Sequence, residues 1–218
     1  MRLLVSISLC VLLVSGAPAR SRRGGNSDRV QPGAFDYYLL ALSWAPDFCD
    51  RPDVQKDPRE CGPGRKLGFV VHGLWPQLED GGHPTQCAPA RPVARDIVQR
   101  ALALIPSEGL IQHEWRDHGT CSGLSSAAYF DTVRKAHDAI VIPADFVQPN
   151  HRINASPAEI EAKFVAANPR FRNSLRIACS GGELSEVRVC MGKDLSPHAC
   201  SSHDRECPAP QVTMLPVQ

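Results

Sequence analysis

Two short runs of apolar residues near the start of the chain are typical of buried strands. The first run, FDYYLLALSW, extends from Phe35 to Trp44, and the second, LGFVVH, ends at His72. Continuous apolar runs of this length are expected of strands that are covered on both faces. Gly73 and Pro76 follow the second run, so we expect the strand to stop there and to place His72 at its end.

The middle of the chain carries apolar residues at the spacing of helices that turn one face to a core. This spacing predicts helices over residues 93–105, 127–140 and 156–167, and a further helix that includes residues 113–118. Pro106 ends the first of them. Ser156 and Pro157 mark the start of the last, because serine is a favoured capping residue and proline suits the first turn.

The last third of the chain returns to strand-like segments, LRIAC and LSEVRVC. Strands therefore stand toward both ends of the sequence, with helices between them and without an internal repeat or a long linker. This order predicts a single α+β domain. Because 43% of the residues are apolar and 22% are charged, the chain is expected to form a globular core.

The first residues are expected to be removed before folding. A basic second residue, an apolar run and the small-residue site APA fit a secretory signal over residues 1–19. The run is too short to cross a bilayer, so we expect a secreted or periplasmic protein with no membrane attachment. Residues 20–33, which are polar and rich in Gly and Arg, are predicted to be a flexible arm, and residues 34–218 the folded domain.

Net charge gives no reason to expect a polybasic protein. The predicted signal holds one of the 24 basic residues and no acid, which leaves 23 basic residues against 23 acidic ones. An anionic ligand would therefore have to be held by a local site and not by a basic face.

Eight cysteines remain once Cys10 leaves with the signal. An exported chain meets an oxidising compartment, so we expect four disulfides, although eight cysteines allow 105 pairings. No two of them form a CxxC pair, which disfavours a zinc site built on cysteine. The eight are Cys49, Cys61, Cys87, Cys121, Cys179, Cys190, Cys200 and Cys207.

Two segments concentrate titratable side chains: FVVHGLWPQ over residues 69–77 and HEWRDHGTC over residues 113–121. Histidine titrates near neutrality, so two histidines can serve as proton donor and proton acceptor in one reaction. On an ideal helix His113 and His118 would point about 140° apart and would not easily bind one ion. HExxH zinc peptidases space their histidines four apart, so a metal hydrolase is a disfavoured alternative and we expect no metal.

Signatures of several other chemistries are absent from the sequence. It has no GxSxG, GxGxxG or GxxxxGK[ST] segment, which disfavours acyl transfer, dinucleotide binding and P-loop chemistry. What remains is acid and base catalysis without a nucleophile from the protein. RNA suits such a site, because its own 2′-hydroxyl can attack the adjacent phosphorus, but these residue types alone would also allow other hydrolytic chemistry.

The segments FVVHGLWP and HEWxxHGTC, in this order and about 40 residues apart, resemble the two active-site segments of the ribonuclease T2 family. The resemblance extends to YYLLALSW followed by FC, and to EVRVC followed by Cys200. It implies a mainly antiparallel central sheet that is flanked by helices and braced by disulfides. It also implies an endoribonuclease that cuts single-stranded RNA through a 2′,3′-cyclic phosphate, acts without a cofactor, and is a monomer.

The resemblance implies a role for each residue that matches the family's active-site segments. His72 would act as the general acid toward the leaving oxygen, and His118 as the general base on the 2′-hydroxyl. His113 and Glu114 would hold and polarise the phosphate.

The aromatic and amide residues of the first segment are implied to bind the substrate's bases. Trp75 matches the aromatic on which the family stacks a base, a contact worth ~1 to 3 kcal/mol. Gln77 stands where relatives often carry Asp or Asn for base contact. Trp44 and Trp115 are expected to be packing residues.

The family's usual pairing of cysteines is implied as well. It would join Cys49 to Cys61, Cys87 to Cys121, Cys179 to Cys207 and Cys190 to Cys200.

One position departs from the family pattern. Asp117 stands where the family has Lys or Arg immediately before the last histidine. A cation there steadies the charge on the phosphorus, and losing such a contact typically lowers the rate by about 10² to 10³. We therefore expect a weaker enzyme, unless Arg116 partly replaces the cation. The alternative is a non-catalytic relative that binds RNA or a protein.

Overall fold

The structure is a computed structural model that describes residues 30–54, 56–204 and 206–217. The predicted signal over residues 1–19 lies outside these residues, and so does most of the predicted arm over residues 20–33. The end of the arm contacts the domain, since the Gly33 backbone N–H donates to the Cys121 carbonyl over 2.9 Å. Among the helices of the described residues, none is both long enough and apolar enough to cross a bilayer.

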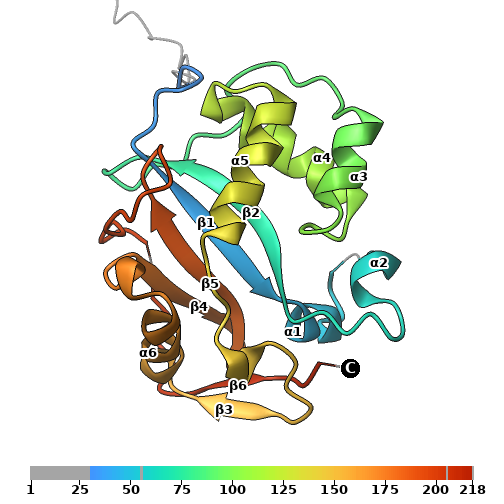
Figure 1. The fold of residues 1–218 in the computed structure, drawn as a ribbon, viewed down its shortest axis with the longest axis vertical. Coiled ribbons are helices and arrows are strands. Elements are labelled where there is room, and N and C mark those ends of the chain that lie inside the picture. Colours follow the sequence, from blue (N-terminus) through green and yellow to red (C-terminus); the bar gives the residue numbers. More distant parts are fainter. Residues whose placement is uncertain (1–29, 55, 205, 218) are drawn as a thin grey trace, which may run out of the picture.

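A six-stranded sheet forms the centre of the molecule (Figure 1). Its strands follow the order β2-β1-β5-β6-β3, and β4 also pairs with β5. Every pair is antiparallel except β5 with β6, so the expected α+β fold with a mainly antiparallel sheet is confirmed. The strands are β1 (Tyr37–Trp44), β2 (Phe69–Gln77), β3 (Ile153–Ala155), β4 (Leu175–Ser180), β5 (Glu183–Met191) and β6 (Val212–Met214).

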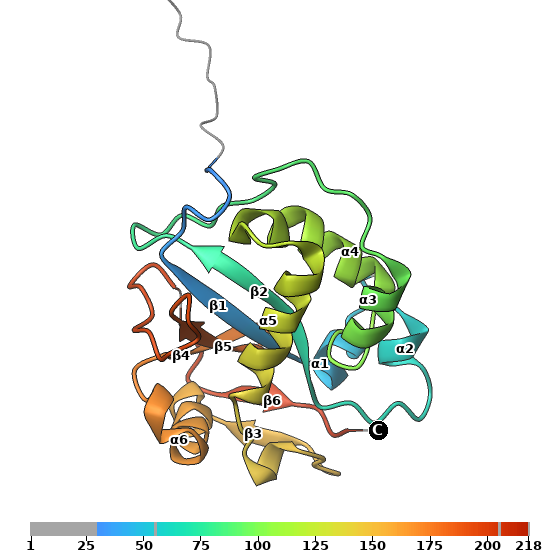
Figure 2. The ribbon, with the colours of Figure 1, turned by 45° about the horizontal axis from the view of Figure 1, so that its top comes forward.

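Helices pack beside the sheet in two places. Figures 1 and 2 show α3, α4 and α5 grouped against β1 and β2, whereas α6 lies near β4. The α-helices are α1 (Ala45–Asp50), α2 (Pro58–Cys61), α3 (Arg95–Ala101), α4 (Glu108–Asp117), α5 (Ser126–Asp138) and α6 (Pro157–Ala167). Short 3₁₀ helices are η1 (Gly119–Ser122), η2 (Ala144–Phe146) and η3 (Pro169–Phe171).

The two faces of the sheet have different environments. Leu40, Leu42 and Trp44 alternate onto the face that α5 covers and are at most 1% exposed. Trp44 is thus a packing residue, as expected. Leu39 and Ala41 point to the opposite face and form a smaller cluster with the Cys190–Cys200 disulfide. The candidate site lies on this second face.

The prediction that the second strand stops at Gly73 is wrong, because β2 continues to Gln77. Pro76 is tolerated, since β2 is an edge strand and its missing N–H interrupts no central pairing. His72 therefore lies inside the strand and not at its end.

Helix ends also differ from the predicted ranges, most of all in the first predicted helix. The helix predicted over residues 93–105 is shorter, and α3 ends at Ala101. The turn that follows contacts the sheet, because the Leu104 carbonyl accepts a hydrogen bond from the Val71 N–H over 3.0 Å. The predicted start at Ser156 is confirmed, because Ser156 and Glu159 form a reciprocal capping box.

Four disulfides brace the domain, and they join the pairs that the family resemblance implies. Cys87–Cys121 ties η1, which follows the second active-site segment, to the loop before α3. Each such bond typically stabilises a domain by ~2 to 4 kcal/mol. The others are Cys49–Cys61, Cys179–Cys207 and Cys190–Cys200.

Candidate active site

His72 reaches the site through a bulge in β2. The register of β1 with β2 shifts here, because Leu42 pairs with Val71 whereas Ala41 pairs with Gly73. His72 is therefore the extra residue. Residues three apart on a regular strand face opposite sides, but the bulge lets His72 and Trp75 face the same side. Their rings lie 5.1 Å apart.

A carboxylate from β5 holds His72, and sequence reasoning missed it. Nδ1 of His72 lies 2.6 Å from Oε1 of Glu186, and Nε of Arg188 donates to the other carboxylate oxygen over 2.7 Å. Because Nδ1–H donates to Glu186, Nε2 of His72 is left for a substrate. The only sequence signal was the alternation of Glu186 and Arg188 in an otherwise apolar strand, which does not reveal their partner.

Glu114 enters the site from α4 and is 1% exposed. Its Oε2 accepts a hydrogen bond from Nε1 of Trp75 over 2.8 Å, and its Oε1 lies 3.9 Å from Nε2 of His72. Gly73 makes this approach possible, because a Cβ at that position would come within 2.0 Å of Glu114 Oε2. The indole that was expected only to stack on a base thus also orients a carboxylate.

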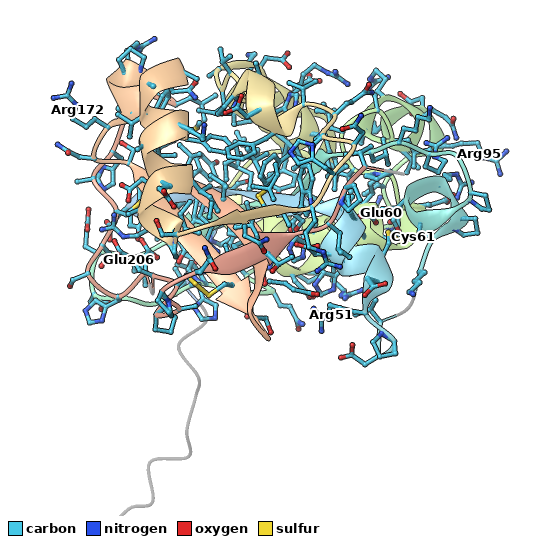
Figure 3. The ribbon with its side chains drawn as sticks, turned by 90° about the horizontal axis from the view of Figure 1, so that it is seen from below. Arg51, Glu60, Cys61, Arg95, Arg172 and Glu206 are labelled. Atoms are coloured by element: carbon cyan, nitrogen blue, oxygen red, sulfur yellow. A yellow bond between two sulfur atoms is a disulfide. The ribbon has the colours of Figure 1, made fainter. Side chains whose placement is uncertain are left out.

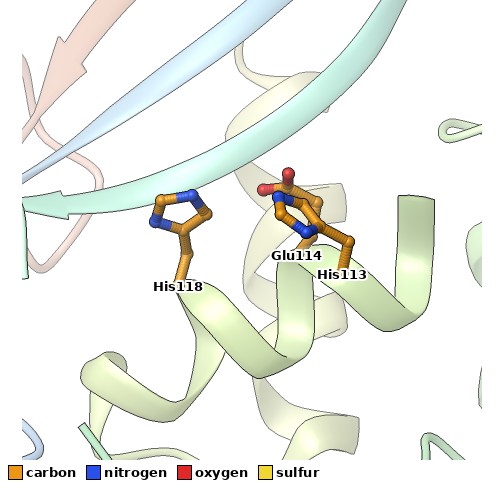
Figure 4. A group of neighbouring side chains, drawn as sticks. All are labelled: His113, Glu114 and His118. Carbon is orange, nitrogen blue, oxygen red and sulfur yellow. The ribbon is translucent and has the colours of Figure 1, made fainter. Parts of the chain in front are cut away.

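The expectation that His113 and His118 diverge by 140° is wrong. α4 ends at Asp117, and His118 is the residue after it, with φ −116° in place of a regular helical value. The His118 ring therefore turns back and lies 6.3 Å from the His113 ring and 5.5 Å from the Trp75 ring. Figure 4 shows His113, Glu114 and His118 directed to one side of the helix, where β2 passes.

Asp117 is a buried member of a hydrogen-bond network beside the site. Its carboxylate accepts hydrogen bonds from Gln86 and, through two nitrogens, from Arg116. Its Oδ2 also lies 2.8 Å from Nδ1 of His113, and Arg116 Nη2 lies at the same distance from that nitrogen. Nη2 of Arg116 carries two hydrogens, so it can donate to Asp117 and to Nδ1 of His113 at the same time, and the three side chains form one network.

The environments of the two histidines displace their pKa values in opposite directions. Burial by itself lowers the pKa of His72, but the hydrogen bond and charge of Glu186 outweigh it and raise the pKa above its usual value. Burial and the neighbouring His113 lower the pKa of His118 to about 4. His72 therefore keeps its proton to higher pH than an ordinary histidine, whereas His118 is neutral at neutral pH.

The two carboxyl groups that face His72 are also displaced in opposite directions. Burial raises the pKa of Glu114 to about 7, although His72 and Trp75 pull it down. Burial also acts on Glu186, but its bond to His72 and the charges of His72 and Arg188 lower its pKa to about 2. Such separated values within one site are typical of acid–base assignments.

A cleft of about 850 Å³ opens beside His72, Glu186 and His113. It extends to the end of the molecule formed by α1 and α2, where Figure 3 labels Arg51, Glu60 and Cys61. Side chains of both charges line it, so the cleft is polar and not uniformly basic. They include Arg51, Asp53, Lys56, Asp57, Arg59, Glu60 and Glu183.

Two residues of the predicted set have environments that bear on their roles. Gln77 is 8% exposed and little of it is open to a ligand, so its base contact stays a prediction. Trp115 packs against Tyr129, and its indole N–H donates to the Arg91 carbonyl, which fits the packing role expected of it.

Comparisons with known proteins point to one family. The sequence profile of the Ribonuclease T2 family matches residues 35–200. A ribonuclease of Aeromonas hydrophila is 46% identical over 177 residues, which are 75% of this chain and 75% of that protein. The fold is similar to that of an RNase-related protein from Calystegia sepium, with a TM-score of 0.67, 20% identity, and coverage of 84% of this chain and 98% of that one.

A second similar structure is that of a ribonuclease, and one mutant of this ribonuclease has been solved with a nucleotide. Ribonuclease MC1 from bitter gourd seeds has a TM-score of 0.63 and 26% identity, and the match covers 82% of this chain and 99% of that one. A mutant of ribonuclease MC1 has been solved with 5′-UMP.

Proposed function

The chain belongs to the ribonuclease T2 family, and on this premise we propose that it is an endoribonuclease that cleaves single-stranded RNA through a 2′,3′-cyclic phosphate. Ribonucleases among its relatives and the nucleotide complex of a structural neighbour support RNA as the substrate. The catalytic step is then the attack of a ribose 2′-hydroxyl on the adjacent phosphorus.

The observation that carries this proposal is the pair of imidazoles with opposite pKa displacements beside one indole. His72 and His118 come from β2 and from the end of α4, and both rings lie within 5.5 Å of the Trp75 ring. A neutral His118 can accept a proton, and a charged His72 can donate one.

In the first step His118 removes the proton of the 2′-hydroxyl. The 2′-oxygen then bonds to phosphorus, while Nε2 of His72 protonates the leaving 5′-oxygen. In the second step the roles reverse: His72 takes a proton from water, the water oxygen attacks the cyclic phosphate, and His118 returns a proton to the 2′-oxygen. Glu186 is a positioning residue that keeps His72 charged and correctly oriented.

His113 and Glu114 stabilise the negative charge on the phosphate. Because burial raises the pKa of Glu114 to about 7, part of the population carries a proton that can hydrogen-bond to a phosphate oxygen. Arg116 is the nearest cation to His113, but Asp117 binds it through two hydrogen bonds. We therefore expect Arg116 to replace the family's cation only weakly.

The cleft beside His72 accommodates further nucleotides, and Arg51, Lys56 and Arg59 provide local cations for their phosphates. Trp75 offers a ring for base stacking, and Gln77 a weaker polar contact. In this proposal the signal at residues 1–19 directs export, and the enzyme acts as a monomer without a cofactor.

The test is product analysis. The purified protein is incubated with oligoribonucleotides and EDTA at mildly acid pH, and the ends are identified by mass spectrometry. We expect 2′,3′-cyclic phosphate ends at early times and none with a substrate whose scissile nucleotide is a deoxyribonucleotide. Cleavage of the deoxy substrate at an equal rate would refute the mechanism.

Asp117 favours a second candidate, a family member that binds RNA without cleaving it. The same substrates distinguish the two functions. If RNA binds with equal affinity to the wild type and to His72→Phe, and neither protein cleaves it, the binding function is supported and the enzyme is not.

A further inference from the structure

We propose that Arg188 of β5 is a further phosphate-binding residue of this site, and that its guanidinium stabilises the negative charge on the reacting phosphate from the β5 side. The ligand is the phosphate group of a nucleotide. The catalytic half of this inference rests on the proposed function, whereas phosphate binding can be measured without cleavage.

Arg188 lies beside the indole around which the two histidines of the site are arranged. Its Cζ is 5.8 Å from the centroid of the Trp75 ring, and the rings of His72 and His118 lie 5.1 and 5.5 Å from that ring. In the sheet Arg188 pairs with Ala41 of β1, so the side chain that separates it from β2 is a single methyl group. The guanidinium is therefore next to the place where a phosphate between the two histidines would lie.

The guanidinium of Arg188 has donors to offer a ligand. Nε donates to Oε2 of Glu186 over 2.7 Å, but no acceptor in the described part of the chain takes a hydrogen bond from Nη1 or Nη2. The side chain is 28% exposed, so solvent and ligands can reach it. Because arginine commonly binds phosphate through two parallel N–H groups, the two Nη groups are suited to such a ligand.

The uncompensated positive charge of the site lies on its β5 side. Glu186 is ionised at neutral pH and lies between Arg188, at 2.7 Å, and the ring of His72, at 2.6 Å. When His72 carries its second proton, this group of three has one positive charge in excess. On the α4 side Asp117 neutralises Arg116 through two hydrogen bonds, and that pair has no excess. The cation that the family resemblance implies on α4 is thus supplied from β5 in this chain.

A role of Arg188 that is limited to holding Glu186 predicts a change of the opposite sign. Burial and the charge of Arg188 lower the pKa of His72, and Glu186 raises it. Without Arg188 the ring of His72 would keep its proton to higher pH and would attract a phosphate more strongly. Direct contact predicts weaker binding, because a charge and two donor groups are lost. Phosphate affinity therefore distinguishes the two roles.

Binding is measured by isothermal titration of the full chain near neutral pH, with uridine 3′-phosphate and with uridine, which lacks the phosphate. In Arg188→Gln the affinity for uridine 3′-phosphate should fall about 10- to 100-fold, and that for uridine should stay. Arg188→Lys keeps the charge without the paired N–H groups and should lose less. Arg176→Gln is the matched control, because Arg176 pairs with Arg188 in the sheet but donates to the Leu175 and Cys200 carbonyls.

Several results would overturn the phosphate contact. One is an affinity of Arg188→Gln for uridine 3′-phosphate that equals or exceeds that of the wild type. Another is an equal loss for uridine, or an equal loss in Arg176→Gln. A wild type that binds uridine 3′-phosphate no better than uridine would overturn it as well.

Cleavage is measured second, on a dinucleotide in which sulfur replaces one non-bridging oxygen of the scissile phosphate, in each of its two stereoisomers. Sulfur is a weaker acceptor than oxygen, so the wild type should cleave the isomer with sulfur toward Arg188 more slowly. In Arg188→Gln kcat/KM on the all-oxygen substrate should fall by about 10², and the two isomers should become more alike. An unchanged ratio between the isomers would overturn the catalytic half. If the wild type binds uridine 3′-phosphate but cleaves no RNA, the proposed function fails, and the titration still decides the phosphate contact.

Discussion

Replacing Glu186 by Gln should move one limb of the pH–rate profile and leave the other in place. The substitution removes the charge 2.6 Å from His72 but keeps an oxygen that accepts a hydrogen bond from Nδ1–H. Arg188 then loses its carboxylate partner, and its charge acts on His72 without compensation. Both effects lower the pKa of His72.

The size of the change follows from the distance and exposure of the pair. Two unit charges about 4 Å apart near a protein surface interact by about 4 kcal/mol. The His72 side chain is 37% exposed, so screening reduces this to on the order of 1 to 3 kcal/mol. One pKa unit corresponds to about 1.4 kcal/mol, so the pKa of His72 should fall by about 1 to 2 units. Glu114 and Glu60 remain near His72 and oppose a larger fall.

The assay is kcat/KM for a dinucleotide substrate between about pH 3 and 9. His118 must be neutral to accept a proton, so its pKa of about 4 sets the acid limb. His72 must be charged to donate one, so its raised pKa sets the basic limb. In Glu186→Gln the basic limb should move about 1 to 2 units to lower pH, and the acid limb should stay.

A merely structural role would lower kcat/KM equally at every pH. Glu183→Gln is the matched control, because Glu183 lies on the same strand and lines the same cleft, whereas the β5 carboxylate bonded to His72 is that of Glu186. A basic limb that stays in place in Glu186→Gln, or one that moves as far in Glu183→Gln, would refute the argument.

The same ion pair contributes to stability in a defined pH window. Glu186 has its pKa lowered to about 2, so its contribution is present above pH 4.5 and is lost as the pH falls through 2. His72 has its pKa raised, so its contribution is present below pH 6.5 and is lost as the pH rises through the folded value. The difference in free energy of unfolding between wild type and Glu186→Gln should be largest between pH 4.5 and 6.5.

Three further changes test other parts of the site. Gly73→Ala places a methyl group against Glu114 and Trp75. It should lower the free energy of unfolding by about 1 to 3 kcal/mol and lower kcat/KM by more than about tenfold. Values near those of the wild type in urea unfolding and in kinetics would contradict the close approach. Asp117→Lys restores the family's cation and should raise kcat/KM on RNA by about 10²; no rise would show that the missing cation does not limit the rate. Joint replacement of Cys87 and Cys121 by Ala should cost about 2 to 4 kcal/mol in thermal or urea unfolding, and an unchanged midpoint would contradict the bracing role of that bond.

Local patterns in the sequence were enough for most of the secondary structure. The strand at Tyr37–Trp44 follows from a continuous apolar run, and the strand at Glu183–Met191 from the strand-like segment LSEVRVC. The helix after Ser156 follows from its capping signals. These features depend on neighbours in the chain, so they can be read without knowing the fold. The two segments that hold His72 and His118 could be found for the same reason.

The sequence therefore determined which elements form and which histidines are candidates, whereas the tertiary structure decided how their side chains meet. A one-residue bulge against β1 puts His72 and Trp75 on one face, and the end of α4 turns His118 toward His113. Glu186 reaches His72 across 114 positions of sequence. Pairing register, helix termination and long-range contacts depend on the packing of distant segments, and no local pattern encodes that packing.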